Sequence, residues 1–242
     1  MFQRLFSPIT ELLFPSICHL CKEFIPDAGE VKLCPDCLAK APPLLSPNCN
    51  CCGQPFESPI GADHHCGSCI TDPPPFCAAR AALLFEESTR ELIHQFKYSK
   101  RVMLGRPLGL LAAAYLGEFA GEFGADLIVP VPLHVKRLRQ RGFNQAVLLG
   151  EFFSSKWGVA LSRNSLKRIR WTEPQVNLGA RERAANVKGA FAVDSVNMIS
   201  GKRILLVDDV YTTGSTAKEC CRVLMRAGAA DVAVLTIARG TG

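Results

Sequence analysis

Hydrophobic residues beyond residue 80 recur first at helical spacing and then in short aliphatic runs. In residues 88–98, Leu92, Ile93 and Phe96 share one face of a helix. Further helices are predicted over residues 107–123, 140–157 and 215–227. Strands are predicted over residues 126–132, 204–207 and 231–237. This alternation predicts an α/β fold, with a parallel sheet flanked by helices and ligands bound at the carboxyl ends of the strands.

Cysteines dominate the N-terminal part of the chain, where the spacing C-x2-C occurs four times in two sets. The sets are Cys18, Cys21, Cys34 and Cys37, then Cys49, Cys52, Cys66 and Cys69. Four thiolates at this spacing can hold one zinc ion tetrahedrally, with no open position, which is typical of structural zinc. Because the segment is rich in Pro and Gly and has little core, we expect metal to supply much of its folding energy.

Some details of these sites stay open. Cys51 could replace Cys49 or Cys52, and His64 or His65 could compete as ligands, so we expect one or two zinc ions. Free cysteines with accidental spacing are the alternative, which four equal gaps in so short a segment disfavour. Three successive prolines begin at Pro73 and indicate a stiff spacer. We therefore predict a zinc module over residues 1–72, a linker over 73–79 and a larger domain over 80–242.

Composition and charge narrow the class of protein. Of the 242 residues, 48% are hydrophobic and 21% charged, as in a soluble globular protein. Pro8 and Glu11 interrupt the unbroken apolar stretch that a signal peptide needs. The longest weakly charged stretch is too short to span a membrane, so we expect a cytoplasmic protein without membrane insertion. Residues 1–129 carry 10 Lys and Arg against 14 Asp and Glu, whereas residues 130–242 carry 18 against 8. The basic second half favours a phosphate-bearing partner.

The chemistry-bearing segment directly follows the aliphatic run 204–207. Two carboxylates, Asp208 and Asp209, end that predicted strand, and a loop rich in hydroxyls opens the next helix. Its backbone N–H groups and the positive end of the helix dipole can cradle a phosphate. The carboxylates can accept hydrogen bonds from two ribose hydroxyls. A merely capped helix is the alternative, but a cap needs one Ser or Thr, and this loop has Thr212, Thr213, Ser215 and Thr216 around Gly214.

Residues 204–216 resemble the phosphoribosyl pyrophosphate (PRPP) signature of type I phosphoribosyltransferases. The whole chain is similar to the ComF/GntX family, in which two zinc-binding Cys clusters precede a phosphoribosyltransferase-like domain. Besides the signature, the resemblance rests on residues 129–132, 141–145 and 170–175, and on Arg181, Asn186, Gly189, Ala190 and Phe191.

The resemblance implies roles for individual residues. Asp208 and Asp209 would bind the ribose hydroxyls, and one of them would take a proton from the attacking nucleophile. The 5′-phosphate would lie on Val210, Thr212, Thr213, Gly214, Ser215 and Thr216. Pyrophosphate, carried with Mg²⁺, would lie on the turn formed by Pro130 and Val131, with Arg141 nearby. A mobile hood over residues 168–183 would bring Arg170, Thr172 and Gln175 over the reaction.

Two function classes follow from the resemblance and the basic segments. The first is a Mg²⁺-dependent phosphoribosyltransferase that binds PRPP or a related ribose 5-phosphate compound, with an unknown acceptor, and works in natural competence or use of DNA. In the first class, the basic segments 134–141 and 163–170 would form a rim that binds pyrophosphate and the acceptor. The alternative is a non-catalytic competence adaptor, which would bind single-stranded DNA along the same segments and dock through its zinc ribbons on a helicase or pore protein. Lys97 ends a helix and either reaches the site or, as we favour, places its charge at the helix C-terminus.

Overall fold

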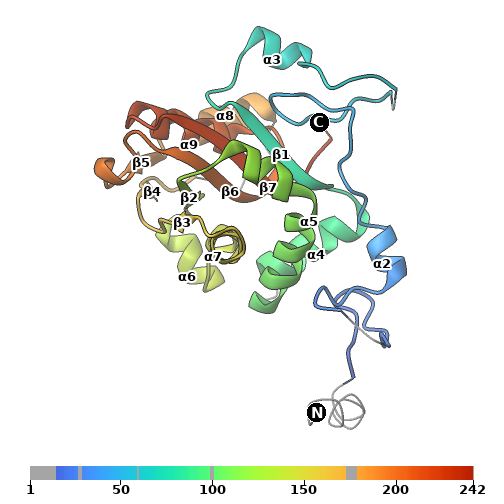
Figure 1. Cartoon of the computed structure of the whole chain (residues 1–242). Helices are drawn as coiled ribbons and strands as arrows, with labels where there is room; N and C mark the ends of the chain where they lie inside the picture. Colours follow the sequence, from blue (N-terminus) through green and yellow to red (C-terminus); the bar gives the residue numbers. More distant parts are fainter. Residues whose placement is uncertain (1–14, 27–28, 59, 99–100, 173–178, 242) are drawn as a thin grey trace.

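The computed structural model describes residues 15–26, 29–58, 60–98, 101–172 and 179–241 (Figure 1). Its central sheet has five strands in the order β1-β7-β6-β2-β3, and every neighbouring pair is parallel. The strands of this sheet are β1 (Ala78–Leu84), β2 (Leu127–Pro130), β3 (Ala160–Leu161), β6 (Arg203–Tyr211) and β7 (Asp231–Arg239). A separate antiparallel pair joins β4 (Leu166–Arg168) to β5 (Phe191–Val193). The predicted fold class is therefore confirmed.

Helices cover both faces of the sheet (Figure 1). One face packs against α4 (Glu87–Tyr98), α5 (Gly105–Phe123) and α7 (Gln145–Trp157), and the other against α8 (Ala180–Val187) and α9 (Ser215–Arg226). The aliphatic run at the start of β6 alternates between these two cores, so that Leu205 and Val207 meet one and Ile204 and Leu206 the other. All four side chains are fully buried, which explains why this strand reads as continuously hydrophobic.

The predicted helices and strands are present, with two differences. The expected helix over residues 140–157 is two helices, α6 (Val135–Arg141) and α7, because Gly142 has a left-handed φ of 88° and Asn144 caps α7. Strand β6 also continues through Asp208 and Asp209 to Tyr211, where we expected it to end at the carboxylates. The shorter elements in the described part of the chain are α2 (Pro35–Ala39), α3 (Gly67–Thr71), η1 (Val102–Leu104) and η3 (Val196–Met198).

The cysteine-rich segment lies against the sheet edge formed by β1. Leu44 N donates to Ala82 O at 2.9 Å and Leu84 N donates to Pro42 O at 2.9 Å. Strand β1 begins at Ala78, so it includes the last two residues of the range that we assigned to the linker. Within the described ranges, no helix combines the length and the apolar character that crossing a lipid bilayer requires.

Candidate functional site

A cavity of about 880 Å³ opens at the carboxyl ends of β6 and β7. Its wall includes all the residues that we predicted from Asp208 to Thr216, together with Val131 and Arg141. Tyr98 from α4, Arg137 from α6 and Trp171 beyond β4 close its other sides. The fold thus brings a phosphate loop, a carboxylate pair and several cations into one space, at the edge of the sheet where parallel strands present ligand sites.

The loop from Thr212 to Ser215 has the form of an anion cradle. Gly214 adopts a φ of 72° and directly precedes α9, so the loop leads into a helix N-terminus, the kind of position at which backbone N–H groups bind anions. A Cβ atom on Gly214 would lie 2.1 Å from the Tyr211 hydroxyl oxygen, so no larger residue fits. Arg183 Nη1 donates to Thr212 Oγ1 at 3.3 Å, which places a cation beside the loop.

The two carboxylates differ in their surroundings. Lys97 Nζ lies 2.8 Å from Asp209 Oδ1, whereas Asp208 Oδ1 accepts a hydrogen bond from the Asp209 backbone N–H at 2.9 Å. Burial, followed by the charge of Asp209, raises the pKa of Asp208 to about 7, and Lys97 offsets part of that rise. The pair therefore combines an ion-paired carboxylate with a carboxyl group that changes protonation near neutral pH.

This environment makes stability depend on pH. An unfolded Asp ionises above about pH 4, whereas folded Asp208 holds its proton up to about pH 7. Folding therefore binds a proton in that window, and ionisation of Asp208 lowers stability as pH rises, by up to about 1.4 kcal/mol per pH unit. We expect the free energy of unfolding of Asp208→Asn, measured relative to the wild type by urea titration, to be higher at pH 8 than at pH 5. The control Asp194→Asn removes an exposed carboxylate paired with Lys167, and its stability relative to the wild type should not rise with pH in this way. If the stability difference between Asp208→Asn and the wild type is the same at pH 5 and pH 8, the raised pKa of Asp208 is contradicted.

Lys97 is a functional candidate that sequence reasoning placed elsewhere, and Arg168 is one that it placed only within the predicted hood and a basic segment, without a role of its own. We favoured a helix-end charge for Lys97, and the structure instead aims it at Asp209, because α4 packs with its last turn against the cavity. Arg168 lines the cavity and lies with its guanidinium 5.3 Å from the Phe191 ring centre. Only the basic run containing Arg168 was visible in the sequence, and its direction depends on the β4–β5 pair.

The residues predicted for the hood are placed differently. Arg170 Nη2 donates to the carbonyls of Asn186 and Lys188 at 2.9 and 2.7 Å, and Arg170 is not among the residues that line the cavity. Thr172 is buried, and its hydroxyl accepts a hydrogen bond from Arg168. Gln175 lies outside the described residues. Pro130 is buried in β2 and is not among the residues that line the cavity, whereas its neighbour Val131 is.

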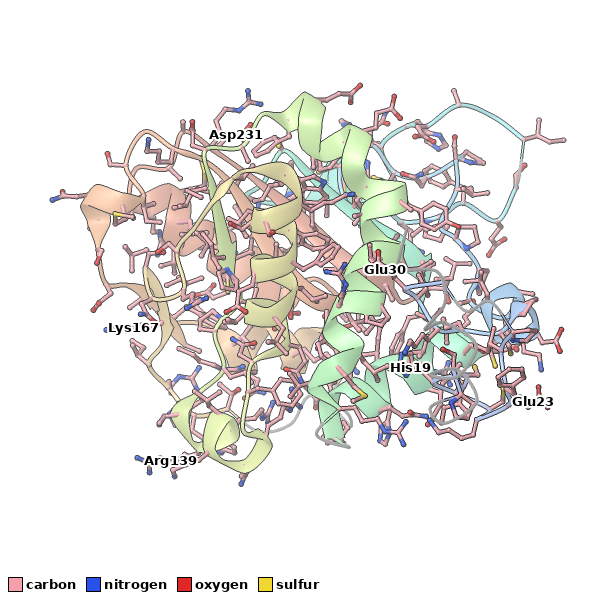
Figure 2. All side chains as sticks on the ribbon, turned by 60° about the horizontal axis from the view of Figure 1, so that its bottom comes forward. His19, Glu23, Glu30, Arg139, Lys167 and Asp231 are labelled. Carbon is pink, nitrogen blue, oxygen red and sulfur yellow. The ribbon has the colours of Figure 1, made fainter. Side chains whose placement is uncertain are left out.

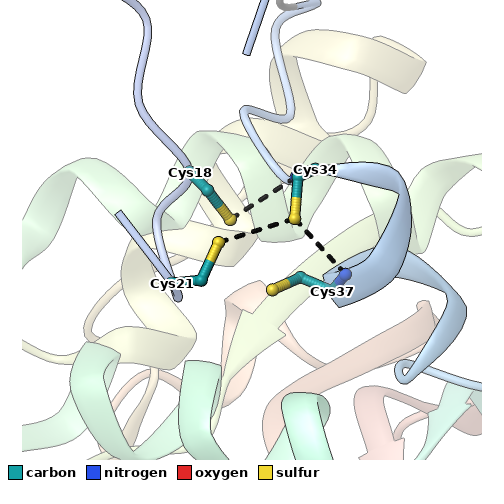
Figure 3. A group of neighbouring side chains, drawn as sticks. All are labelled: Cys18, Cys21, Cys34 and Cys37. Carbon is teal, nitrogen blue, oxygen red and sulfur yellow. Dashed lines mark hydrogen bonds between the residues drawn. The ribbon is translucent and has the colours of Figure 1, made fainter. Parts of the chain in front are cut away.

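The first cysteine cluster has the geometry of a zinc site. The sulfurs of Cys18, Cys21, Cys34 and Cys37 lie within 4.8 Å of one another (Figure 3). Cys21 Sγ and Cys34 Sγ are 3.6 Å apart, close to the roughly 3.8 Å that a tetrahedron with zinc–sulfur bonds of about 2.3 Å requires. Burial alone would raise the pKa of Cys18, but backbone N–H groups, including that of Cys34, lower it to about 6 and so favour the ligating thiolate.

The second cluster consists of Cys49, Cys52, Cys66 and Cys69, with sulfurs again within 4.8 Å of one another. Cys52 Sγ and Cys66 Sγ are 3.8 Å apart, and backbone N–H groups of both residues donate to Cys49 Sγ. Cys51 is not part of this cluster, and His64 stacks on Phe56 at a centroid distance of 3.9 Å. The predicted grouping of the eight cysteines into two zinc sites, each with four cysteine ligands, is confirmed.

The chain is similar to known proteins over most of its length. Residues 9–70 match the family model described as a double zinc ribbon domain. The chain is 33% identical to the DNA utilization protein YhgH of Salmonella typhimurium over 232 residues, which cover 94% of this chain and 99% of that protein. It is 32% identical to Competence protein F of Haemophilus influenzae, covering 80% of this chain and 85% of that protein. Among solved structures, the glutamine PRPP amidotransferase from B. subtilis complexed with ADP and GMP shows 21% identity and a TM-score of 0.35, over 57% of this chain and 26% of that one.

Proposed function

The chain belongs to the family of DNA utilization protein YhgH and Competence protein F, and from this premise we propose that its cavity binds a ribose 5-phosphate compound, first of all PRPP with Mg²⁺. The observation that carries the proposal is the order of groups along β6 and its loop. Asp208 and Asp209 lie directly before the Thr212–Ser215 cradle in one cavity. A ligand with its phosphate on the cradle would share the cavity with both carboxylates, which could accept hydrogen bonds from its sugar hydroxyls.

The remaining groups suit the pyrophosphate end of such a ligand. Arg141, Arg137 and Arg168 line the same cavity, and their planar guanidinium groups match phosphate oxygens in pairs. Arg141 also lies over the Tyr98 ring at 5.2 Å, a contact that limits its rotamers and so pre-orders it for a ligand.

The reaction that this arrangement supports is transfer of the ribose 5-phosphate group to a nucleophile. The bond from C1 of the sugar to pyrophosphate breaks, a bond from C1 to the nucleophile forms, and the proton of the nucleophile goes to a carboxylate. Asp208 suits this last role because its raised pKa lies near neutral pH. The arginines stabilise the departing charge, and no protein nucleophile is needed.

Magnesium fits the donor set of the site. Carboxylate oxygens are hard ligands of the kind that Mg²⁺ takes, and Asp208 and Asp209 supply two of them beside the proposed diphosphate position. The ion, when bound with PRPP, would neutralise charge on the leaving pyrophosphate. Lys97 forms an ion pair with Asp209 in the free protein. When ligand binds, this carboxylate would exchange Lys97 for Mg²⁺ and the ribose hydroxyls.

A second candidate, the DNA-binding adaptor, is favoured by the cations around Trp171. Arg137 and Lys136 lie 5.4 and 5.8 Å from its ring centre, and His134 meets it edge-on at 5.3 Å. An aromatic ring among cations is the arrangement that binds single-stranded nucleic acid. Figure 2 shows Arg139 and Lys167 projecting from the side of the molecule opposite His19 and Glu23, so basic side chains extend beyond the cavity. Phe24, Ile60 and Ile70 are exposed on the cysteine-rich segment and offer apolar contacts to a protein partner.

Two variants separate these candidates. We expect Asp209→Asn to weaken Mg²⁺-dependent binding of PRPP at least tenfold and to leave binding of a fluorescent single-stranded oligonucleotide unchanged. Lys136→Glu changes an exposed residue beside Trp171 that is not among the residues lining the cavity, so it should weaken the oligonucleotide complex, flatten its dependence on salt and leave PRPP binding unchanged. Fluorescence anisotropy and competition by PRPP measure both ligands on the same zinc-loaded protein. Wild-type protein that binds the oligonucleotide but no ribose 5-phosphate compound would reject the first candidate in favour of the second.

A further inference from the structure

Arg239, the last residue of β7, is a buried arginine without a carboxylate partner among the described residues. It is 4% exposed, and its Nε and Nη1 atoms have no hydrogen-bond partner there. Its Nη2 donates to Gln54 Oε1 at 2.8 Å and to Cys52 Sγ at 3.5 Å. Because an arginine stays charged when buried, the position requires negative charge nearby.

The second cysteine cluster supplies that charge when it holds zinc. Cys52 is one of its four ligands, and a zinc ion bound by four thiolates carries a net charge of about −2. Neutral Gln54, the other hydrogen-bond partner, cannot balance the guanidinium.

On its other side, Arg239 supports the phosphate loop. Its guanidinium lies 4.4 Å from the ring centre of Tyr211, which is itself buried and lines the cavity. The Tyr211 hydroxyl lies directly under Gly214, as the 2.1 Å approach to a Cβ at that position shows. Gly240 N also donates to Tyr211 O at 2.9 Å. A continuous series of contacts thus leads from Cys52 through Arg239 and Tyr211 to Gly214.

The backbone of the second cluster is tied to the same sheet edge. Ala79 N in β1 donates to Cys51 O at 2.7 Å, and Arg80 Nη1 donates to Asn50 O at 3.0 Å. Gly53 has a φ of 68°, and a Cβ there would lie 2.6 Å from Ala79 O. The cluster therefore lies in a fixed place relative to β1 and β7. A change in the charge of the cluster then changes the electrostatic stabilisation of the Arg239 guanidinium.

We infer that Arg239 is a positioning residue, through which the zinc-loaded second cluster holds Tyr211 and the Thr212–Ser215 loop in the shape that receives a phosphate. Without the thiolate charge, the guanidinium is an unpaired buried cation, and its withdrawal toward water removes the support under Tyr211. The inference rests on the proposed function for the identity of the ligand, whereas the order of the loop can be measured without one.

Amide hydrogen exchange on the zinc-loaded full chain tests the inference. We expect Arg239→Met to speed exchange of the 212–216 amides about tenfold and Arg239→Lys to speed it less, because lysine keeps the charge but has no planar group to lie over Tyr211. The matched control is Arg203→Met, which removes an exposed arginine lying 4.7 Å from the Phe123 ring centre and should leave the loop unchanged.

Cadmium-113 NMR of the cadmium-substituted protein adds a readout of the metal itself. We expect Arg239→Met to shift the resonance of the second cluster and to leave that of the first cluster in place. Unchanged loop exchange or an unchanged second resonance in a folded variant overturns the inference. If Arg239→Met does not fold, wild-type loop exchange in Arg239→Lys overturns it equally. A loosened loop in Arg239→Met, together with wild-type protein that binds no PRPP, would reject the proposed ligand and leave the role of Arg239 standing.

Discussion

Replacing Gly214 with alanine is expected to lower affinity for a ribose 5-phosphate compound by at least about a hundredfold, the order of loss that follows a displacement of about 1 Å in a binding constellation. The added Cβ would meet the Tyr211 hydroxyl at 2.1 Å and its ring carbon at 2.3 Å. Tyr211 has little freedom to withdraw, since Arg239 lies over one side of its ring and Phe76 meets it edge-on at 6.4 Å. The loop must therefore move, and its N–H groups lose their common direction.

The backbone strain of this substitution needs its own control. Gly158 ends α7 with a φ of 69°, nearly that of Gly214, but a Cβ there meets no atom within 4 Å. We expect Gly158→Ala to share the loss of about 1 kcal/mol in stability that a left-handed alanine causes, and to bind ligand as the wild type does. Isothermal titration with ribose 5-phosphate and urea unfolding measure the two quantities. Equal ligand affinity in both variants would show that the loop is not the phosphate site.

The second large effect is expected at the second zinc site. Cys49 is fully buried, and its sulfur accepts hydrogen bonds from two backbone N–H groups. Serine at this position leaves the zinc with three thiolate ligands and puts a smaller oxygen where these N–H groups meet a sulfur. We expect Cys49→Ser to lower the zinc affinity of this cluster by more than about a hundredfold, which is more than the loss caused by removing a residue that only hydrogen-bonds a metal ligand. Because the metal supplies folding energy to a segment with little core, unfolding should begin in residues 45–70.

Cys51→Ser is the matched control, since Cys51 lies in the same turn but outside the cluster. We expect it to retain two zinc equivalents per chain and Cys49→Ser to retain one, by elemental analysis after gel filtration. The opposite result would make Cys51 the ligand, the alternative that the sequence left open. A chain in which neither change releases zinc would contradict the assignment of this cluster.

Much of the fold was predictable because its central strands and main helices have clear periodicity. Strand β1 was not predicted, since its alanines favour a helix and it becomes a strand only by pairing with β7. The break between α6 and α7 depends on a single left-handed glycine, Gly142, which a helical pattern easily hides. Pairing partners and one-residue turns are tertiary facts, and a single sequence carries little signal for them.

The candidate site was predictable where its residues are consecutive and less so where they converge from distant elements. The stretch from Asp208 to Thr216 lines one cavity because one strand and one loop carry it. Lys97 reaches that cavity from α4, and Arg168 from the β4–β5 pair. For such residues the sequence shows a charge but not its direction. Arg239 is hidden for the same reason, because its partner Cys52 lies 187 positions earlier in the chain.

Calorimetric titration of PRPP into the zinc-loaded protein, with and without Mg²⁺, tests the central claim most directly. Asp208→Asn/Asp209→Asn serves as the comparison, because it keeps the size of both side chains and removes their charge. We expect micromolar binding that requires Mg²⁺ in the wild type and disappears in the double variant. Absence of binding in the wild type, or equal binding by both proteins, would contradict the claim that the carboxylate pair and phosphate loop form a PRPP site.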